Sequence, residues 1–598
     1  MSSQKYSVNQ HLIETLLVWV NSGEIAIPEI QRPFVWDSSK VRDLMDSLYQ
    51  GYPIGYVIAW RNPNVRLKDG SLSEGKKILI DGQQRVTALT AAILGQYVIN
   101  KIYQRVKIKI AFHPIDEKFE VQNPAIVKDK TWLPDISEIF NGSTSVMKII
   151  RKYLELNPEQ DEELIENSIT RLVNIPKKQI GLIELASELE IETVTEIFIR
   201  INSKGVVLSQ ADFVMSKIAS NTEYNGNHLR KAIDYFCHLT IAPDFFKHII
   251  DNDKEFSNSD FFQKMQWLKT ENEDLYDPDY NDLIRVAFTT QFNRGRLSDL
   301  VSLLSGRNFE TRTYEDSIAE KSFATLKIGV NNFINETNFK RFLMIIKSAG
   351  FISPKLIRSQ NAINFAYIVY LKLKDLGVNS VLIESYVRRW LVYSILTGRY
   401  SGSPESTFDF DIKQISQKPF NDYLKEKEDG ELSDAFWEAS LPQSLDTSVA
   451  SSPYFNVFLA SQVKSNDRGF LSKDVLVGDL ISLRGDIHHL FPKDYLKKNG
   501  LDRGRYNQIA NYVYMQSEIN IKVGNKPPKD YFETITIQMQ QNNKLVSGLS
   551  TEQELLCNLK MNSVPTEIMQ MSIDDYNEFL ILRRKLMALK IKEYYFSL

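Results

Sequence analysis

The first 125 residues alternate short apolar runs with polar turns, which predicts a mixed domain of strands and helices. Apolar runs at 53–60 and 76–80 are typical of buried strands. Polar and apolar residues alternate over 105–114, as in a half-buried strand. Residues 118–121 could pair with that strand across a tight turn.

Between these strands, residues 38–51 predict an amphipathic helix. Ser38 or Ser39 can cap it, and Gly51 ends it. Its apolar face consists of Val41, Leu44, Met45 and Leu48.

The helical period dominates the middle of the chain, with examples at 192–201, 208–219 and 380–396. An acidic run at 159–166 indicates a solvated helix face, and the charged stretch 425–434 a surface loop. Residues 572–595 predict a long helix that Ser572 caps.

Composition limits the class of protein. The chain has 598 residues, of which 43% are hydrophobic and 25% charged, the mix of a folded soluble protein with several domains. Its net charge of −3 does not indicate nucleic-acid binding, so any basic surface must be local. Two cysteines, Cys237 and Cys557, exclude a disulfide scaffold. Because no signal peptide or long apolar run is visible, we expect a cytoplasmic protein and no membrane partner.

A first candidate site follows the strand at 76–80. Asp81 and Gly82 form a turn, and a helix runs from there to Gly95. Backbone N–H groups at a helix start attract anions, and a glycine lets the backbone approach a phosphate. Arg85, one turn into the helix, can bind a phosphate oxygen, and Asp81 could hold the accompanying metal ion. The alternative is an ordinary helix start at which Asp81 caps and Arg85 pairs with an acid.

The upstream run 27–37 contains Gln31 and Arg32 beside two aromatic residues. One interpretation is an extended edge strand that packs its aromatics. The other is a second wall of the same cleft, in which Gln31 and Arg32 face the ligand.

A second candidate site begins at the adjacent pair His488 and His489. Cutting a phosphodiester requires a base that takes a proton from water and a divalent ion that stabilises the developing charge. His489 can be the base, and His488 and Asn520 can hold the ion. Asn511 can hydrogen-bond the loop that orients the pair. The alternative is two structural histidines among ordinary loop asparagines.

Basic residues surround this second site. Residues 488–530 hold eight Lys or Arg against four acids, a balance that suits a phosphate backbone. Lys493, Lys522 and Lys526 are the candidate DNA contacts. Asp486 could add a metal ligand. In the middle of the chain, 386–403 interleaves arginines with aromatic residues, which indicates either nucleic-acid binding or, more simply, a helix with an apolar core face and a basic outer face.

Three runs near the N-terminus, IPEIQRPFVW (27–36), GYPIGYVIAW (51–60) and LIDGQQRVTAL (79–89), resemble the N-terminal domain of the GmrSD-type restriction proteins. That domain is similar to the ParB/sulfiredoxin fold, in which a G-x-x-R turn binds nucleotide phosphates. The matching turn here is Gly82, Gln83, Gln84 and Arg85. A later family motif resembles FIRINSKGVVLSQAD (198–212), which adds Asn202, Lys204 and Gly205, although the family usually has a small residue in place of Lys204.

The run HHLFPK (488–493), followed by Asn511 and Asn520, resembles the HNH, or ββα-metal, nuclease motif of the C-terminal domain in that family. The first histidine replaces an aspartate common in other HNH enzymes. A nitrogen ligand suits Mn, Ni or Zn at least as well as Mg, so the metal is left open among these.

The resemblance implies an α+β protein of several domains: a ParB/sulfiredoxin-like α/β nucleotide-binding domain (1–125), its helical extension (126–235), a helical middle (236–470), an HNH nuclease domain (471–545) and a C-terminal helical segment (546–598). It implies an antiphage endonuclease that binds and hydrolyses a nucleoside triphosphate and cuts modified or phage DNA with a divalent metal. Relatives of the SspE and BrxU type share both motifs, so a phosphorothioation-dependent nicking protein is an alternative. Another is a nucleotide-gated DNA-binding regulatory protein with an inactive HNH domain. A homo-oligomer stays open.

Overall fold

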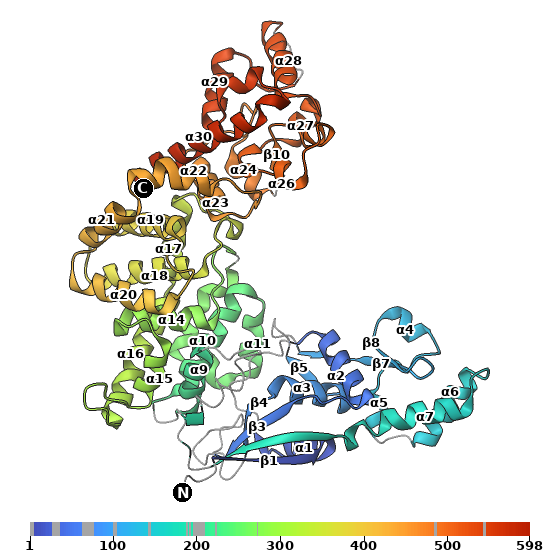
Figure 1. Ribbon diagram of the computed structural model, residues 1–598. Coiled ribbons are helices and arrows are strands. Elements are labelled where there is room, and N and C mark those ends of the chain that lie inside the picture. The colour runs from blue at the N-terminus through green and yellow to red at the C-terminus, as the bar shows by residue number, and fades with distance from the viewer. Residues whose placement is uncertain are drawn as a thin grey trace. The chain divides into compact units, whose positions relative to one another are not determined.

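The structure is a computed structural model. It describes residues 5–26, 36–61, 77–99, 105–141, 145–186, 189, 193–194, 210–221, 224–271, 273–483, 487–541 and 546–598. Contacts divide the chain into two compact units, Met1–Lys231 (unit 1) and Ala232–Leu598 (unit 2) (Figure 1). The protein is α+β and mostly helical, with its largest described sheet in unit 1.

The main sheet of unit 1 has the strand order β1-β9-β3-β4-β2. Its strands are β1 (Tyr6–Leu12), β2 (Ile25–Ala26), β3 (Tyr56–Arg61), β4 (Lys77–Asp81) and β9 (Gln179–Leu185). The predicted strands at 53–60 and 76–80 correspond to β3 and β4, which pair antiparallel. β9 lies between β1 and β3, antiparallel to the first and parallel to the second.

The position of β9 changes the predicted division of unit 1. We expected 126–235 to be a helical extension, but β9 comes from this segment and joins the sheet of the first domain. Buried Ile180, Leu182 and Leu185 hold it there. Residues 1–125 therefore do not complete their own sheet, and the two predicted segments share one core.

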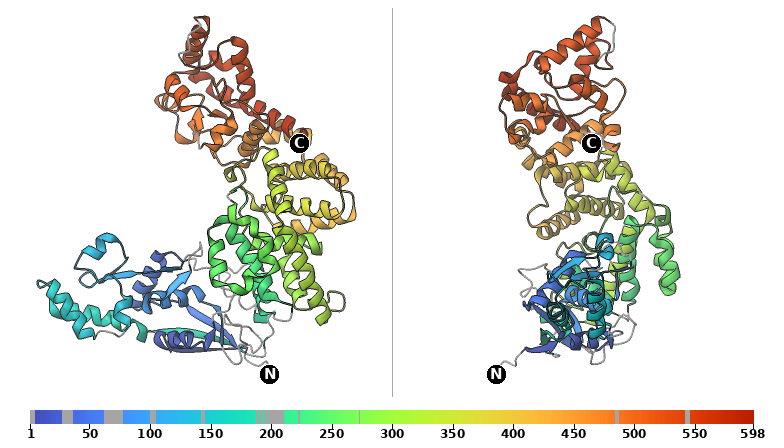
Figure 2. Two further views of the ribbon diagram at one scale, coloured as in Figure 1. Left: turned by 180° about the vertical axis from the view of Figure 1, so that it is seen from behind. Right: turned by 90° about the vertical axis from the view of Figure 1, so that its right-hand side faces the viewer.

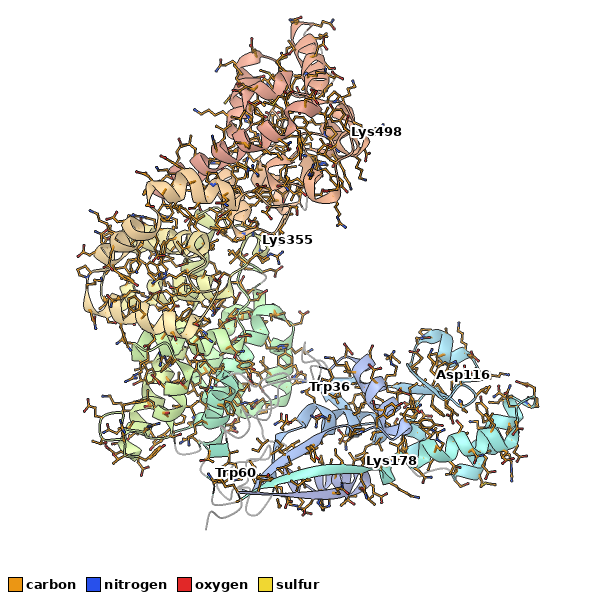
Figure 3. All side chains as sticks on the ribbon, in the orientation of Figure 1. Trp36, Trp60, Asp116, Lys178, Lys355 and Lys498 are labelled. Carbon is orange, nitrogen blue, oxygen red and sulfur yellow. The ribbon has the colours of Figure 1, made fainter. Side chains whose placement is uncertain are left out.

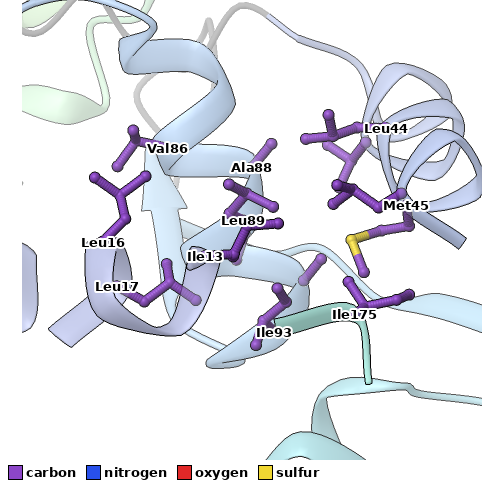
Figure 4. Close-up of a cluster of buried hydrophobic side chains, with 14 of the residues drawn as sticks. Ile13, Leu16, Leu17, Leu44, Met45, Val86, Ala88, Leu89, Ile93 and Ile175 are labelled. Atoms are coloured by element: carbon purple, nitrogen blue, oxygen red, sulfur yellow. The ribbon is translucent and has the colours of Figure 1, made fainter. Parts of the chain in front are cut away.

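Three helices, α1 (Ile13–Asn21), α2 (Ser38–Gln50) and α3 (Gln83–Ile93), supply much of that core. Figure 4 shows side chains of the three helices gathered in one apolar cluster, among them Leu16 of α1, Leu44 of α2 and Val86 of α3. The predicted apolar face of α2 is buried, and Gly51 ends the helix at φ 79°. The predicted cap was wrong, because Asp37, not Ser38 or Ser39, accepts from the Lys40 N–H.

The predicted strand 105–114 is two strands. β6 (Arg105–Lys107) pairs back with β5 (Tyr97–Ile99), while β7 (Ile110–His113) pairs forward with β8 (Lys118–Val121). The strand is interrupted at Ile108 and Lys109, between the two pairings. Pairing of 118–121 across the turn is confirmed.

Short helices complete unit 1: α4 (Pro124–Lys128), α5 (Ser137–Phe140), α6 (Val146–Leu156), α7 (Glu162–Val173) and α9 (Gln210–Ser220). The acidic run 159–166 begins α7 with exposed glutamates, as predicted, and Asp161 caps that helix. The predicted helix at 208–219 corresponds to α9. Most of the predicted helix 192–201 lies outside the described residues.

Helices dominate unit 2 in every view (Figure 2). Up to residue 464 they are α10 (Gly226–Ile241, which starts in unit 1), α11 (Phe245–Asn252), α12 (Lys254–Ser257), α13 (Asp260–Lys264), α14 (Tyr280–Phe292), α15 (Leu297–Leu304), α16 (Asp316–Ile334), α17 (Glu336–Ser348), α18 (Gln360–Asp375), α19 (Ser380–Thr397), α20 (Pro404–Gln417), α21 (Phe420–Glu431), α22 (Leu441–Ser444) and α23 (Pro453–Lys464). Among the described residues, none of the helices is long and apolar enough to cross a membrane.

The charged stretch 425–434 is not the predicted loop, because most of it lies in α21. Glu428 is buried there and accepts hydrogen bonds from Arg389 of α19 and the Tyr595 hydroxyl. Lys427 also pairs with Glu431 along the helix at 3.7 Å. The buried carboxylate of Glu428 and the i,i+4 ion pair of Lys427 and Glu431 stabilise this helix. The charge run alone did not predict it.

The segment 386–403 has the buried apolar face of its simpler interpretation, but Arg389 and Arg399 pair with buried acids and do not form the expected basic outer face. Trp390, Tyr393 and Tyr400 are buried. Arg399 donates from Nε to Asp411 at 2.8 Å, and that carboxylate also accepts from the Tyr400 and Tyr423 hydroxyls. Because these aromatic rings are buried, a nucleic-acid base cannot stack on them.

The last part of unit 2 contains two strands among helices. Its elements are α24 (Val477–Ser482), β10 (Ile487–His489), α25 (Lys493–Lys498), α26 (Arg503–Tyr506), η5 (Ile509–Asn511, a 3₁₀ turn), β11 (Tyr512–Tyr514), α27 (Ser517–Val523), α28 (Pro528–Gln540), α29 (Glu552–Met561) and α30 (Tyr576–Phe596). The long C-terminal helix predicted at 572–595 is α30, which follows a capping box between Ser572 and Asp575.

Candidate functional site

The first candidate site is a tight turn between β4 and α3. Gly82 has φ 88°, and a Cβ built on it would lie 3.1 Å from Cγ2 of Val57. Both the backbone angle and the close approach of β3 require glycine here. No side chain caps α3, so Asp81 does not play the capping role of the alternative interpretation. Gly82, the residue at the start of α3, has no side chain that could cap the helix itself.

Arg85 lies across the start of β3. Its Nη1 donates to the Tyr56 carbonyl, and its Nη2 is 4.0 Å from Oδ2 of Asp81. A Cβ on Gly55 would meet the guanidinium at 3.4 Å, so a glycine also makes room for it. The structure thus brings Asp81, Gly82 and Arg85 together. With side chains about one quarter exposed, Arg85 and Asp81 are accessible to a ligand.

The two glutamines of the turn contact the protein itself. Gln83 donates from Nε2 to the Leu79 carbonyl at 3.2 Å, and Gln84 accepts from the Trp36 N–H at 3.4 Å. Their side chains brace the turn between β4 and the end of the 27–37 run. The remaining candidates for nucleotide binding lie outside the described residues: Gln31, Arg32, Asn202, Lys204 and Gly205.

The second candidate site is a strand pair followed by a helix. β10 and β11 pair antiparallel, with His488 opposite Val513 and His489 opposite Tyr512. α27, which carries Asn520, begins three residues after β11. Along the chain, α25 and α26 come between the two strands.

His489 is held by two neighbours. Its Nε2 is 3.1 Å from Oδ1 of Asn507, and its ring packs edge-on against Tyr512 with centroids 5.1 Å apart. An amide oxygen only accepts, so this bond places the hydrogen on Nε2 and leaves Nδ1 as the acceptor. The sequence analysis missed Asn507, although its position four residues before Asn511 in an Asn-rich stretch was a usable signal.

The surroundings of His489 favour its neutral form. Burial lowers the pKa of its imidazole below the ordinary value, and the hydrogen bond that it donates to Asn507 opposes that shift. The charges of Lys493 and His488 lower the pKa further. A neutral imidazole is the form that can accept a proton from water.

Asn511 fastens the turn that follows the histidines. It is fully buried, and its Oδ1 accepts from the Phe491 N–H at 2.8 Å. Its Nδ2 donates to the carbonyls of Phe491 (3.1 Å) and Tyr506 (3.3 Å). One side chain therefore satisfies both backbone groups of Phe491, two residues after His489. This geometry suits the orienting role proposed for it.

His488 and Asn520 are the candidate metal ligands, and both are half-buried. They offer one imidazole nitrogen and one amide oxygen, a set that suits a borderline divalent ion but fills only part of its coordination. No cluster of three His, Cys, Asp or Glu side chains occurs within the described parts of the chain. Asp486 lies outside those parts.

The basic residues around this site are exposed and free of acidic partners. None of the eight Lys and Arg residues of 488–530 has a described carboxylate within 4 Å. Lys493 and Lys497 lie over the Tyr506 ring at 5.8 and 5.6 Å, and Lys498 lies at the outer surface (Figure 3). Asn525 donates to Asp494 at 3.4 Å, which ties the segment of Lys526 to α25.

One comparison with known proteins concerns the first site. Residues 13–219 match the family model described as "GmrSD restriction endonuclease, N-terminal domain". This segment of the chain is therefore similar to that domain. It includes the Gly82 turn and the 198–212 segment, and it ends before unit 2. The HNH resemblance of the second site therefore depends on its own residues.

Over nearly its whole length, the chain is also similar to "Uncharacterized protein MJ0686" of Methanocaldococcus jannaschii. The two are 22% identical over 638 residues, which cover 96% of each chain. Both units therefore have a counterpart, in the same combination, in an archaeal protein.

Proposed function

We propose that this protein is a defence endonuclease of the restriction type, in which an N-terminal nucleotide-binding domain controls a metal-dependent HNH nuclease that nicks or cuts DNA. The observation that supports it best is the environment of His489. Burial lowers the pKa of His489, its Nε2 is held by Asn507, and Asn511 fastens the turn that follows it.

In the nuclease step, Nδ1 of His489 takes a proton from the water that attacks phosphorus. His488 and Asn520 would hold a divalent ion, which supplies a positive charge to stabilise the phosphorane and the leaving oxygen. Mg or Mn suits this chemistry, and the nitrogen ligand also admits Ni or Zn. Lys493, Lys522 and Lys526 bind neighbouring phosphates of the DNA backbone.

In the N-terminal domain, the start of α3 and Arg85 bind the phosphates of a nucleoside triphosphate. Asp81 holds the nucleotide's metal or polarises the attacking water. Gln31, Arg32, Gln83, Gln84, Asn202, Lys204 and Gly205 complete the proposed nucleotide site. The support is the left-handed turn at Gly82 (φ 88°), where a Cβ would lie 3.1 Å from Cγ2 of Val57 on β3.

A nuclease that contacts the DNA backbone has little sequence discrimination of its own. It therefore needs a signal that spares host DNA. We propose that the signal is a modification of the DNA and that nucleotide hydrolysis in unit 1 reports it.

The test combines the purified protein, plasmid DNA, and Mg or Mn, with and without each nucleoside triphosphate. The plasmids are unmodified, hydroxymethyl- or glucosyl-cytosine-containing, or phosphorothioated. We expect cleavage of one modified plasmid and an effect of nucleotide on its rate. Cleavage that phosphorothioate alone triggers would favour the SspE type.

His489→Ala should abolish cleavage, with a loss of about 100-fold or more for a missing general base. The matched control is His248→Ala, an exposed histidine on α11 outside both sites, which should cleave like the parent. If His489→Ala cleaved DNA as fast as the parent, His489 would not be the general base. No cleavage of any plasmid by the parent would favour a regulatory DNA-binding protein.

A further inference from the structure

Helix α30 carries a buried arginine directly behind the second site. Arg583 is 1% exposed, and it donates from Nη1 to the Ala510 carbonyl at 2.7 Å and from Nη2 to the Asn562 carbonyl at 3.3 Å. No described carboxylate lies within 4 Å of it, and its Nε has no hydrogen-bond partner in the described structure. Its partners are thus two backbone carbonyls rather than a counter-charge.

Burying a cation without an acidic partner costs free energy, and an apolar side chain of similar volume is often as stable or more so. Burial lowers the pKa of Arg583 to about 9, which still leaves the guanidinium charged at neutral pH. Packing alone does not explain an arginine here. Its two carbonyl bonds are the feature that an apolar side chain would lose.

The carbonyl of Ala510 belongs to the peptide that leads into Asn511. Asn511 in turn bonds the loop after the histidines, through its side chain to Phe491 and through its carbonyl to the Leu490 N–H at 2.9 Å. Leu490 is the residue next to His489. Two successive sets of hydrogen bonds therefore connect Arg583, through the Ala510–Asn511 peptide, to the backbone next to the proposed base.

A second set of contacts reaches the same turn from the same side. The Tyr531 hydroxyl donates to the Leu490 carbonyl at 3.1 Å, and this tyrosine lies close enough to Arg583 to feel its charge. The Phe491 ring packs on Tyr576 and Phe579 of α30, with centroids 5.1 and 5.0 Å apart. Leu490 and Phe491 are thus fixed on both their polar and their apolar sides.

We propose that Arg583 is a positioning residue for the nuclease, which fixes the Ala510–Asn511 peptide and thereby the orientation of His489. This inference rests on the proposed function of His489 as the base. Arg583 touches neither DNA nor metal in this proposal and acts only through the peptide that it binds.

The kinetic test uses the whole chain with three substitutions. Arg583→Met keeps the length and removes both donors, whereas Arg583→Lys keeps the charge and can restore one bond. Tyr594→Phe is the matched control, because it removes a buried bond of the same helix, to the Ala349 carbonyl at 2.5 Å, far along the chain from the loop. Unfolding midpoints are measured for all three.

We expect Arg583→Met to lower kcat by about 10- to 100-fold with little change in KM for DNA, since misplacing a reacting group by a fraction of an ångström has effects of that size. Arg583→Lys should recover part of the loss. Tyr594→Phe should lose comparable stability and retain kcat.

A spectroscopic arm separates positioning from the proposed function. The chain has only seven histidines, so ring-labelled histidine gives a small set of NMR signals that His489→Ala can assign. Arg583→Met should shift or broaden the His489 signal and leave that of His11 in place. This readout does not require the parent to cleave DNA.

The outcomes are distinct. If the parent cleaves no DNA while the His489 signal still moves in Arg583→Met, the nuclease proposal fails and the positioning role stands. An unmoved His489 signal together with an unchanged kcat in Arg583→Met would overturn the inference. If that variant does not fold, Arg583→Lys decides by the same two readouts.

Discussion

Two basic segments of unit 2 look alike in sequence and differ in structure. In the helical middle, Arg389 and Arg399 turn inward to buried Glu428 and Asp411. Around the second site, Lys493, Lys522 and Lys526 face solvent without a described acid beside them. The arginines of the first segment form ion pairs inside the protein, whereas the lysines of the second are exposed and can bind an external anion.

The difference shows that a mixture of basic and aromatic residues does not by itself indicate nucleic-acid binding. What matters is whether the chain supplies the counter-charge. Buried Asp411 satisfies Arg399 from elsewhere in the helical bundle. The second segment keeps its excess of positive charge, so an external polyanion is the remaining partner.

The largest effect should come from breaking the internal pairing. Arg399→Met leaves the fully buried Asp411 with only two hydroxyl donors. We expect unit 2 to lose about 3–5 kcal/mol of unfolding free energy, as when one partner of a buried ion pair is removed. Denaturant titration measures this. If Arg399→Met instead weakened DNA binding and left the unfolding free energy unchanged, Arg399 would be a DNA contact and not a structural residue.

Removing the exposed charge should affect binding and spare stability. A variant with Lys493, Lys497, Arg503 and Arg505 all changed to Gln should bind DNA roughly 10- to 100-fold more weakly and lose about three to four units of its log–log salt slope. Fluorescence anisotropy at several salt concentrations measures both. An unchanged slope would place the DNA on another surface.

A single exposed lysine sharpens the comparison. Lys526→Gln should lower affinity by a few-fold, equally for all sequences, and reduce the salt slope by about one. The same anisotropy series measures it. A loss that depended on sequence would contradict a simple phosphate contact.

The smallest effect should come from a solvent-exposed pair in the helical middle. Lys340 and Glu336 are 2.8 Å apart, with both side chains about half exposed. Lys340→Gln should change unfolding free energy by less than about 1 kcal/mol and leave DNA affinity alone. A larger loss of affinity would extend the DNA-binding surface to α17.

Local patterns predicted the local features well. The apolar face of α2, the turn at Gly82 and the pairing of 118–121 each depend on neighbouring residues, and each is present. β9 was missed because its place in the sheet depends on pairing with strands more than a hundred residues away. The same holds for α21, where Glu428 is buried only because Arg389 and Tyr595 reach it.

The candidate sites show the same limit. The histidine pair and Asn511 were visible as residues with suitable chemistry. Asn507 and Arg583 were not, since an asparagine in a loop and an arginine in a C-terminal helix acquire meaning only from what they contact. The nucleotide and metal assignments stay predictions.

The position of α30 in the chain also sets an order of events during synthesis. A ribosome completes His488, His489 and Asn511 well before it makes Tyr576–Phe596, the helix against which their turn packs. Until that helix emerges, the Phe491 ring lacks Tyr576 and Phe579 as packing partners, and the Ala510 carbonyl lacks its hydrogen bond from Arg583. If this site cuts DNA, the loop that follows His489 acquires its final packing only after α30 has been synthesised.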